Sequence, residues 1–241
     1  GHAGTINVTV SGGTFVSTEL DEVDKIIIPS GVSFTQTATN ILAVGVNKFS
    51  VSTSGTLNIT GYNDNGDLDF SGHDGTINVT ISGGSLVNTN LDEVDKITIP
   101  SGVTVTATAA NAQPLASIID VESGGILNIS SYNNSGDLDF SGHAGTINVT
   151  ISGGALVNTN LDEVNKITIP NSVTATATAA NAQPLASIID VESGGILNIS
   201  GYNNSGDLDF SGHAGTINVT ISSGALVSTE LDEVDKIIVP S

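Results

Sequence analysis

Carboxylates at recurring positions are the side chains in this sequence best suited to chemistry. The turn at 63–69, Asn-Asp-Asn-Gly-Asp-Leu-Asp, places five oxygen-bearing side chains within seven residues. Such spacing is typical of calcium loops, because Ca²⁺ takes carboxylate and amide oxygens as ligands. The turn lacks the distal glutamate of an EF-hand, however, and its later copies replace Asp64 and Asn65. Since Asn, Asp and Gly are also the usual residues of tight turns, a plain turn is the alternative.

A second group of carboxylates is expected on the outer face of neighbouring strands. We expect Asp120 and Glu122 to stack beside Asp137 and Asp139 of the following coil, with Lys166 on the coil after that. Like charges in register repel, so a bound cation would relieve such a stack. Calcium is therefore the only cofactor expected. The candidate metal ligands are Asn63, Asp64, Asn65, Asp67, Asp69, Asp120, Glu122, Asp137, Asp139, Asp190, Glu192, Asp207 and Asp209.

The four histidines, His2, His73, His143 and His213, recur at equivalent positions of a repeat. Equivalent positions would lie three coils apart, roughly 14 Å, which is too far for one shared ion. We expect each of them to be a corner residue that is either hydrogen-bonded within the fold or exposed. The sequence also shows no nucleophile and base pair unique to one site, so we expect no enzyme and no catalytic residues.

One segment, Gly-His-(Ala/Asp)-Gly-Thr-Ile-Asn-Val-Thr, begins at Gly1, Gly72, Gly142 and Gly212. The chain is thus three repeats, 1–71, 72–141 and 142–211, and a partial fourth, 212–241. Because it repeats one unit, its function should be read from the array rather than from a unique pocket. The pattern breaks off at Val239–Ser241, where internal copies continue, so we expect a window cut from a longer array.

Within a repeat, an alternating strand, a Ser-Gly or Gly-Gly corner and a second strand recur about three times. This favours an all-β parallel β-helix, or β-solenoid, of about three coils per 70 residues and roughly ten coils over 1–241 as one continuous domain. Segment 88–95 is predicted to make one turn of helix, and 106–115 a loop or bulged third side. The period of two predicts these inward residues: Leu138, Phe140, Ile147, Val149, Ile97, Ile99, Val121, Leu127 and Ile129.

Charge and composition exclude several partners. The chain carries 25 acidic residues against five lysines, for a net charge of −20, and has no arginine and no cysteine. It cannot assemble the basic patch that nucleic acid or an anionic membrane requires. It also has no apolar run of 18 residues, so no membrane insertion is expected.

The strings at 97–106 (Ile-Thr-Ile-Pro-Ser-Gly-Val-Thr-Val-Thr) and 121–130 (Val-Glu-Ser-Gly-Gly-Ile-Leu-Asn-Ile-Ser) resemble the β-solenoid repeats of large bacterial surface proteins, including filamentous adhesins and extracellular matrix fibres. The resemblance implies secretion to the cell surface, a stalk or fibre role and frequently calcium. We therefore expect a structural rod or filament that assembles with itself, head to tail or laterally, with surface glycans as further candidate partners.

A binding module with a flat face, for ice or carbohydrate, is the alternative. Strands of the type Thr-x-Asn-x-Thr resemble those of ice-binding solenoids, whose flat face repeats threonine in register. Here the expected outward residues change from one coil to the next, so we predict no unbroken threonine ladder. In order, these residues are Thr146, Asn148 and Thr150, then Thr174 and Thr176, then Asn198 and Ser200.

Overall fold

The computed structural model describes residues 3–15, 20, 22–134, 136–140, 142–161, 163–203, 206–210, 212–224, 231 and 233–240. The chain forms two compact units. Unit 1 contains Gly1–Thr106, Ser117–Ile126 and Gly142–Gly145, and unit 2 contains Ala107–Ala116, Leu127–Ser141 and Thr146–Ser241. None of the helices in the described part of the chain is long and apolar enough to cross a membrane.

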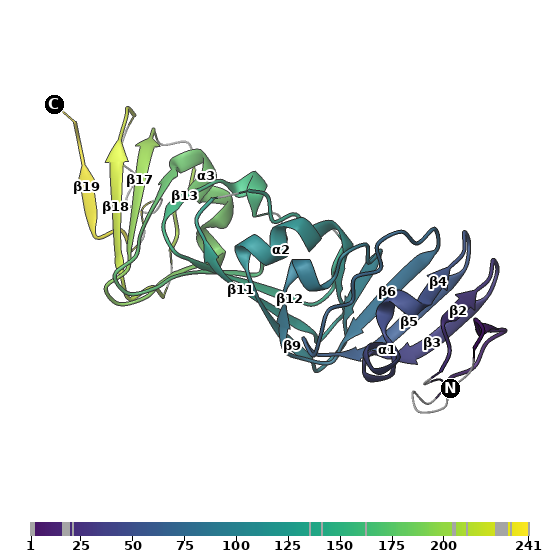
Figure 1. Ribbon diagram of the computed structural model, residues 1–241. Coiled ribbons are helices and arrows are strands. Elements are labelled where there is room, and N and C mark those ends of the chain that lie inside the picture. Colours follow the sequence, from purple (N-terminus) through teal and green to yellow (C-terminus); the bar gives the residue numbers. More distant parts are fainter. Residues whose placement is uncertain are drawn as a thin grey trace. The chain divides into compact units, whose positions relative to one another are not determined.

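Unit 1 is built mainly from short strands (Figure 1). Its elements are β1 (Asn7–Thr9), β2 (Lys25–Ile28), β3 (Ser33–Thr37), α1 (Ala38–Val44), η2 (Val46–Lys48), β4 (Phe49–Val51), β5 (Thr56–Tyr62), β6 (Thr76–Ile81), β7 (Ser85–Leu86), η3 (Asn88–Asn90), β8 (Lys96–Ile99) and β10 (Ile119–Val121). Strand β9 (Thr104–Thr108), helix η4 (Ala116–Ile118) and strand β11 (Ile126–Tyr132) contribute residues to both units.

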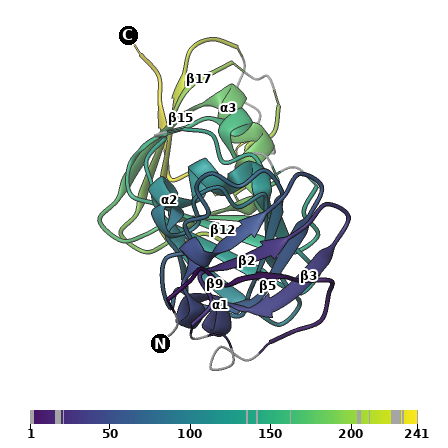
Figure 2. The same ribbon diagram turned by 45° about the vertical axis from the view of Figure 1, so that its right-hand side comes forward.

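The strands of unit 1 pair in parallel, in the sheet orders β1-β2-β4 and β10-β8-β6-β5-β3. The register steps are repetitive: Thr56 pairs with Thr76, Asn78 with Lys96 and Ile97 with Ile119. Together, these steps of 20, 18 and 22 residues are ten residues shorter than the 70-residue repeat. Helix α1 packs beside β3 and β5 (Figure 2). The predicted parallel stacking of strands at regular spacing is confirmed.

Unit 2 repeats the same arrangement. Its elements are α2 (Ala109–Leu115), β12 (Thr146–Ile151), β13 (Gly154–Leu156), η5 (Asn158–Asn160), β14 (Lys166–Ile169), β15 (Thr174–Thr178), α3 (Ala179–Leu185), η6 (Ala186–Ile188), β16 (Ile189–Val191), β17 (Ile196–Tyr202), β18 (Thr216–Ile221) and β19 (Lys236–Ile238). Strand β14 pairs in parallel with β12 and β16, and a second parallel sheet has the order β13-β15-β17-β18-β19.

Equivalent strands of successive copies belong to different sheets. In unit 2, β12 and β18 hold the same Thr-Ile-Asn-Val-Thr-Ile sequence and pair with the equivalent strands β14 and β19, yet they lie in two different sheets. In unit 1, β2 and its equivalent β8 are likewise in separate sheets. Each repeat therefore begins a new sheet.

A glycine makes this change of sheet possible. In unit 1, the backbone N–H of Asp74 donates to the carbonyl of Val51, so the chain passes over the end of β4 before β6 begins. A Cβ on Gly75 would lie 2.6 Å from the carbonyl oxygen of Ser52 and 2.8 Å from that of Gly55. No side chain fits so close to backbone oxygens, which explains why glycine recurs here in the sequence.

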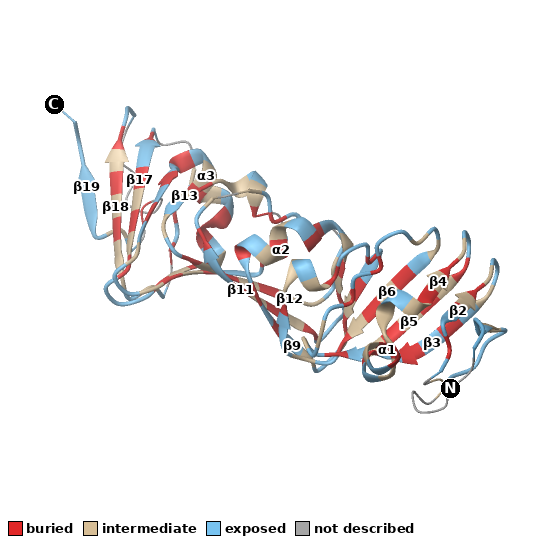
Figure 3. Ribbon diagram, viewed as in Figure 1, coloured by how far each residue is buried: buried red, intermediate tan, exposed pale blue. Residues whose placement is uncertain are grey.

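The core consists of buried residues that alternate along most strands, coloured red in Figure 3, whereas the outermost strands β1 and β19 contain no buried residue. All nine predicted inward residues are at most 1% exposed. Each buried aliphatic side chain contributes about 1.5–3 kcal/mol by removal from water, so these columns supply most of the stabilising free energy. The largest buried side chains include Tyr62, Tyr132 and Tyr202, which are fully buried.

Two predictions concern the segments that interrupt the strands. The single helical turn predicted at 88–95 is confirmed, because η3 and η5 are one-turn 3-10 helices. The loop predicted at 106–115 is wrong, since α2 occupies Ala109–Leu115, and the chain is mostly rather than purely strand. The hydroxyl of Thr108 accepts from the Asn111 N–H and caps the helix, while Pro114 lies in its last turn, where it cannot donate to the Ala110 carbonyl and the helix ends one residue later.

Candidate functional site

Outward asparagines form side-chain ladders across neighbouring strands. In unit 1, the Asn78 Nδ2 donates to Asn58 Oδ1 at 3.0 Å, and Asn58 Nδ2 donates to Ser33 Oγ at 3.0 Å. In unit 2, Asn148 donates to Asn128 and Asn218 donates to Asn198, each at 2.9 Å. These amides are therefore held by one another and fix the strand register.

A second recurring contact joins a carboxylate or amide oxygen to a backbone N–H. The Asp95 carboxylate accepts from the Ile77 N–H at 2.7 Å, and Asp95 N–H donates back to the Ile77 carbonyl at 2.8 Å. Asn165 makes the same pair of bonds with Ile147. The same pair of bonds joins Asp24 to Ile6 and Asp235 to Ile217. We call each such pair of bonds a backbone clamp. Because an amide replaces the carboxylate at Asn165, this position needs an acceptor rather than a charge.

The bond from Ile217 also affects the acidity of its partner. The Ile217 N–H favours the ionised form and so lowers the pKa of Asp235, and a hydrogen bond from His213 acts in the same direction.

The expected stack of Asp120 and Glu122 on Asp137 and Asp139 is wrong. Asp120 lies beside Thr98 on β8, and its carboxylate is 2.7 Å from Lys96 Nζ. On the other side of β10, the Val121 carbonyl accepts from the backbone of the segment 144–145. Asp190 is placed in the same way beside Thr168 in unit 2, 2.7 Å from Lys166 Nζ. Each aspartate is thus neutralised by its own lysine, so no uncompensated stack arises there.

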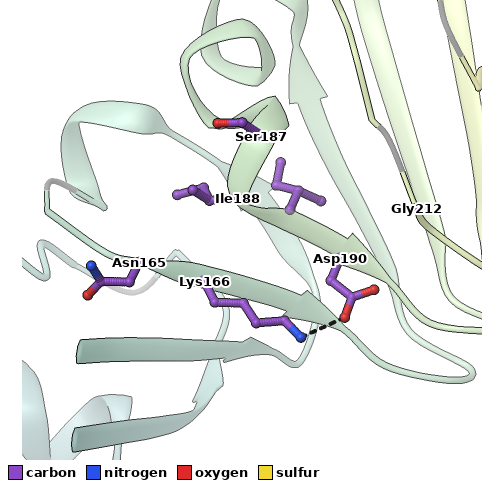
Figure 4. Close-up of a pocket in the computed structure, with 7 residues that line it drawn as sticks. Asn165, Lys166, Ser187, Ile188, Asp190 and Gly212 are labelled. Atoms are coloured by element: carbon purple, nitrogen blue, oxygen red, sulfur yellow. Dashed lines mark ion pairs between the residues drawn. The ribbon is translucent and has the colours of Figure 1, made fainter. Parts of the chain in front are cut away.

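The Lys166–Asp190 pair borders a small cavity in unit 2 (Figure 4). The cavity, of about 310 Å³, is lined by Asn165, Lys166, Ser187, Ile188, Ile189, Asp190 and Gly212. Figure 4 shows the lysine and aspartate side chains pointing toward each other from β14 and β16. The pair is half to one-third exposed, so it contributes at most about 1 kcal/mol.

An equivalent cavity of about 300 Å³ lies in unit 1, lined by Lys25, Asn47, Phe49, Ser50, Asp69, Ser71, Gly72 and His73. Ser50 stands where the other copies have Asp120 and Asp190, so this cavity offers a hydroxyl at that position. We call the two cavities the lysine grooves. Their cation, hydroxyls and carboxylate can hydrogen-bond a small polar molecule.

The oxygens of the predicted calcium turn are used within the fold. The Tyr62 hydroxyl donates to the Gly66 carbonyl at 2.9 Å, and Asn90 Nδ2 donates to Asp64 Oδ1 at 3.3 Å. Burial, with the nearby Asp64 charge, raises the pKa of Tyr62 to about 12. In unit 2, Asn160 donates to Asn134 in the same way. These contacts match a structural turn, while the cation-binding role stays a prediction.

The remaining candidate ligands point outward. The exposed ones are Asn63, Asn65, Asp67, Asp69, Glu122, Asp137, Asp139, Glu192, Asp207 and Asp209. Between Asp137 and Asp139, buried Leu138 donates its N–H to the Asn160 carbonyl, so this segment lines up with η5. Across the residues that the structure describes, no three acidic or histidine side chains converge in a way that could hold a metal ion.

Equivalent histidines adopt two arrangements. His73 Nδ1 accepts from the Val51 N–H at 3.0 Å, and the ring meets Phe70 edge-on. His213 Nδ1 instead lies 2.9 Å from the Phe210 carbonyl, and its Nε2 lies 3.4 Å from Asp235. Both rings therefore have partners, as predicted for corner residues. His2 lies outside the described residues.

The partners in the asparagine ladders could not be assigned from the sequence, and the side-chain bonds to the backbone and the lysine–aspartate pairs were missed. The signal for all three was the recurrence of most of these residues among copies, but pairing them required the register steps. Comparison of the whole chain with family models, with curated proteins and with solved structures found no match.

Proposed function

We propose that this chain is a segment of a structural β-solenoid that acts as a rigid extracellular rod or filament, as in a stalk or matrix fibre at a bacterial surface, and that it has no catalytic role. The observation that carries the proposal is the recurrence of the same strand-to-strand contacts in successive copies. Asn78–Asn58, Asn148–Asn128 and Asn218–Asn198 are one contact made three times.

Contacts of this kind would help a repeated array to resist mechanical force. Each clamp from an Asp or Asn to a backbone N–H adds about 0.5–1.5 kcal/mol, and in repeat proteins such nearest-neighbour terms add up along the stack. The two lysine grooves lie at equivalent positions of the repeat. This supports the view that they arise from the way successive strands are stacked. The sequence resemblance to surface adhesins and matrix fibres supports the extracellular setting.

Self-assembly is part of the proposal. Parallel sheets leave unpaired N–H and carbonyl groups at their edge strands, and pairing with a second copy would satisfy them. Head-to-tail stacking would extend the rod, lateral contact would bundle it, and surface glycans are the proposed external partners. Calcium at the turns would stiffen such an assembly.

Inserting an extra copy of residues 142–211 tests the rod. We expect the maximum dimension from small-angle scattering to grow by roughly 15 Å, since slightly more than three strand layers of about 4.8 Å are added. The cross-sectional radius should not change. Growth of the cross-section, or no change in length, would refute a solenoid. Electron microscopy at rising protein concentration tests filament formation, with monomeric rods throughout counting against self-assembly.

A further inference from the structure

The strand register of unit 1 aligns four threonines in one column. Thr37 pairs with Thr60, Thr60 with Thr80 and Thr80 with Thr98. The prediction of no unbroken threonine ladder is confirmed for the strands on which it was based, where Thr176 pairs with Asn198, but it is wrong for unit 1. It failed because the unequal register steps bring threonines together that a uniform spacing would separate.

Two rows of similar residues lie side by side on one side of this column. One row is Ser33, Thr56 and Thr76, and the other is Thr35, Asn58 and Asn78. We call the column and both rows the threonine face. Neighbours on adjacent strands are about 4.8 Å apart, and successive outward residues along a strand about 6.6 Å apart, so the groups form a regular grid.

The threonine face is outward and rigid. Its residues alternate with buried ones such as Ile59, Val79 and Ile97, each 0% exposed, which fixes the side on which the hydroxyls lie. Threonine is β-branched and has few rotamers, and the Asn78–Asn58–Ser33 hydrogen bonds hold the amides. Thr60 is further held by donation to the Gln36 carbonyl at 3.4 Å. Little side-chain entropy is lost when such a surface meets a rigid partner.

The face is uncharged although the chain carries a net charge of −20. Charge begins only at its border, where Asp120 follows Thr98 in the column and Lys96 follows Asn78 in a row. An uncharged, regularly spaced array of hydroxyls, methyls and amides complements a partner that is itself uncharged and periodic. Ice and crystalline polysaccharide are two materials with these properties.

The burial of the aromatic side chains favours ice over polysaccharide as the partner of this face. The apolar faces of sugar rings are commonly bound by exposed aromatic rings, and this chain has no tryptophan. Its Tyr and Phe rings are at most 3% exposed, except for Phe15, which is only half-buried and stacks on Phe34 and Phe49. The threonine face therefore supplies no stacking platform, whereas its grid of hydroxyls and methyls can hold ordered water.

We propose that the threonine face of unit 1 binds the surface of ice, by anchoring a layer of ordered water that joins the ice lattice. This activity is independent of the rod function. Unit 2 provides an internal comparison, because its equivalent surface is interrupted. Ile196 stands where unit 1 has Thr56, Ser200 where it has Thr60 and Ile238 where it has Thr98.

Two matched substitutions in the full chain test the proposal. Thr80→Lys places a long charged side chain within the threonine column, and Thr220→Lys makes the same change at the equivalent, equally half-buried position of unit 2. We expect the unmodified protein to shape ice crystals and to lower the freezing point below the melting point. Thr80→Lys should reduce this freezing gap about tenfold, while Thr220→Lys leaves it nearly unchanged.

The outcomes separate the possible partners. Absence of ice shaping by the unmodified protein at millimolar concentration overturns the proposal, as do equal losses in both variants. Binding to microcrystalline cellulose without ice shaping assigns the face to polysaccharide instead. A change in oligomeric state with Thr80→Lys, without ice activity, assigns it to self-association. Circular dichroism melting of both variants confirms that each is folded before it is compared.

Discussion

At the scale of single residues, the recurring aspartates Asp24, Asp95 and Asp235 act as hydrogen-bond acceptors for the backbone. The position of Asp95 shows this, because the equivalent Asn165 holds the Ile147 N–H at 2.6 Å without a charge. This role could not be predicted from the sequence, because composition reveals charge but not the direction of a side chain.

Substitution of Asp95 tests this role. Asp95→Ala should lower the free energy of unfolding by about 1 kcal/mol, because the Ile77 N–H loses its acceptor. Asp95→Asn should cost clearly less, since the amide oxygen replaces the carboxylate as it does at Asn165. Urea unfolding of both variants measures the difference, and equal losses would show that the charge matters.

The environment of His73 predicts a pH dependence. Burial lowers the pKa of His73 from its ordinary value of 6.5, against the raising effect of Glu93, Asp74 and Asp69 and with a small lowering effect of Lys25. The folded state thus prefers the neutral ring, whose Nδ1 accepts the Val51 N–H. This contribution to stability is fully present above about pH 6.5 and is lost as the pH falls through the lowered folded pKa.

The variant His73→Gln isolates this effect from the other histidines. Between pH 7.5 and 5, the unmodified protein should lose more stability in urea unfolding than the variant does, so their difference shrinks with acidification. Parallel pH profiles for the two proteins would contradict the assignment.

At the scale of elements, the alternation of apolar residues was enough to identify the strands and their inward faces. Ile97, Ile99 and Leu127 were predicted inward and are fully buried. Helix α2 was missed because its small residues and Pro114 are typical of loops, and the Thr108 cap becomes visible only once the preceding strand is placed. The threonine column was missed because register depends on loop length, which sequence periodicity does not report.

Gly75 lies where the chain passes over the end of β4, and substituting it tests the packing at this point. Gly75→Ala should destabilise the protein by about 1–3 kcal/mol, because the new methyl group meets the carbonyl oxygens of Ser52 and Gly55. Gly4→Ala is the matched control: it holds the same position of the repeat but has nothing within 4 Å of its Cβ site. Thermal melting of both variants measures the difference. Equal effects would show that packing over β4 is not the reason for glycine.

At the scale of the whole molecule, the net charge of −20 opposes folding through self-repulsion. We expect the melting temperature to rise by a few degrees as NaCl increases from about 10 to about 150 mM, because the screening length falls from about 30 to about 8 Å. A melting temperature independent of salt would show that the lysine pairs already balance the local charge.

Calcium is tested in the same experiment at matched ionic strength. If the turns at 63–69 and their copies bind calcium, millimolar CaCl₂ should raise the melting temperature beyond the effect of MgCl₂, and a chelator should reverse the rise. Identical curves for the two salts would refute the predicted sites.

The start of a new sheet in every repeat has a consequence for how such an array meets its surroundings. Identical residues in consecutive copies do not line up above one another, as the separate sheets of β12 and β18 show. Exact duplication therefore does not place equivalent strands in one continuous sheet, and cannot by itself build one long, uniform sheet face. A surface found in one repeat alone arises only where the copies differ in sequence, as Thr56 and Thr60 differ from Ile196 and Ser200. The repeat that departs most from the others is therefore the one best suited to bind a specific partner.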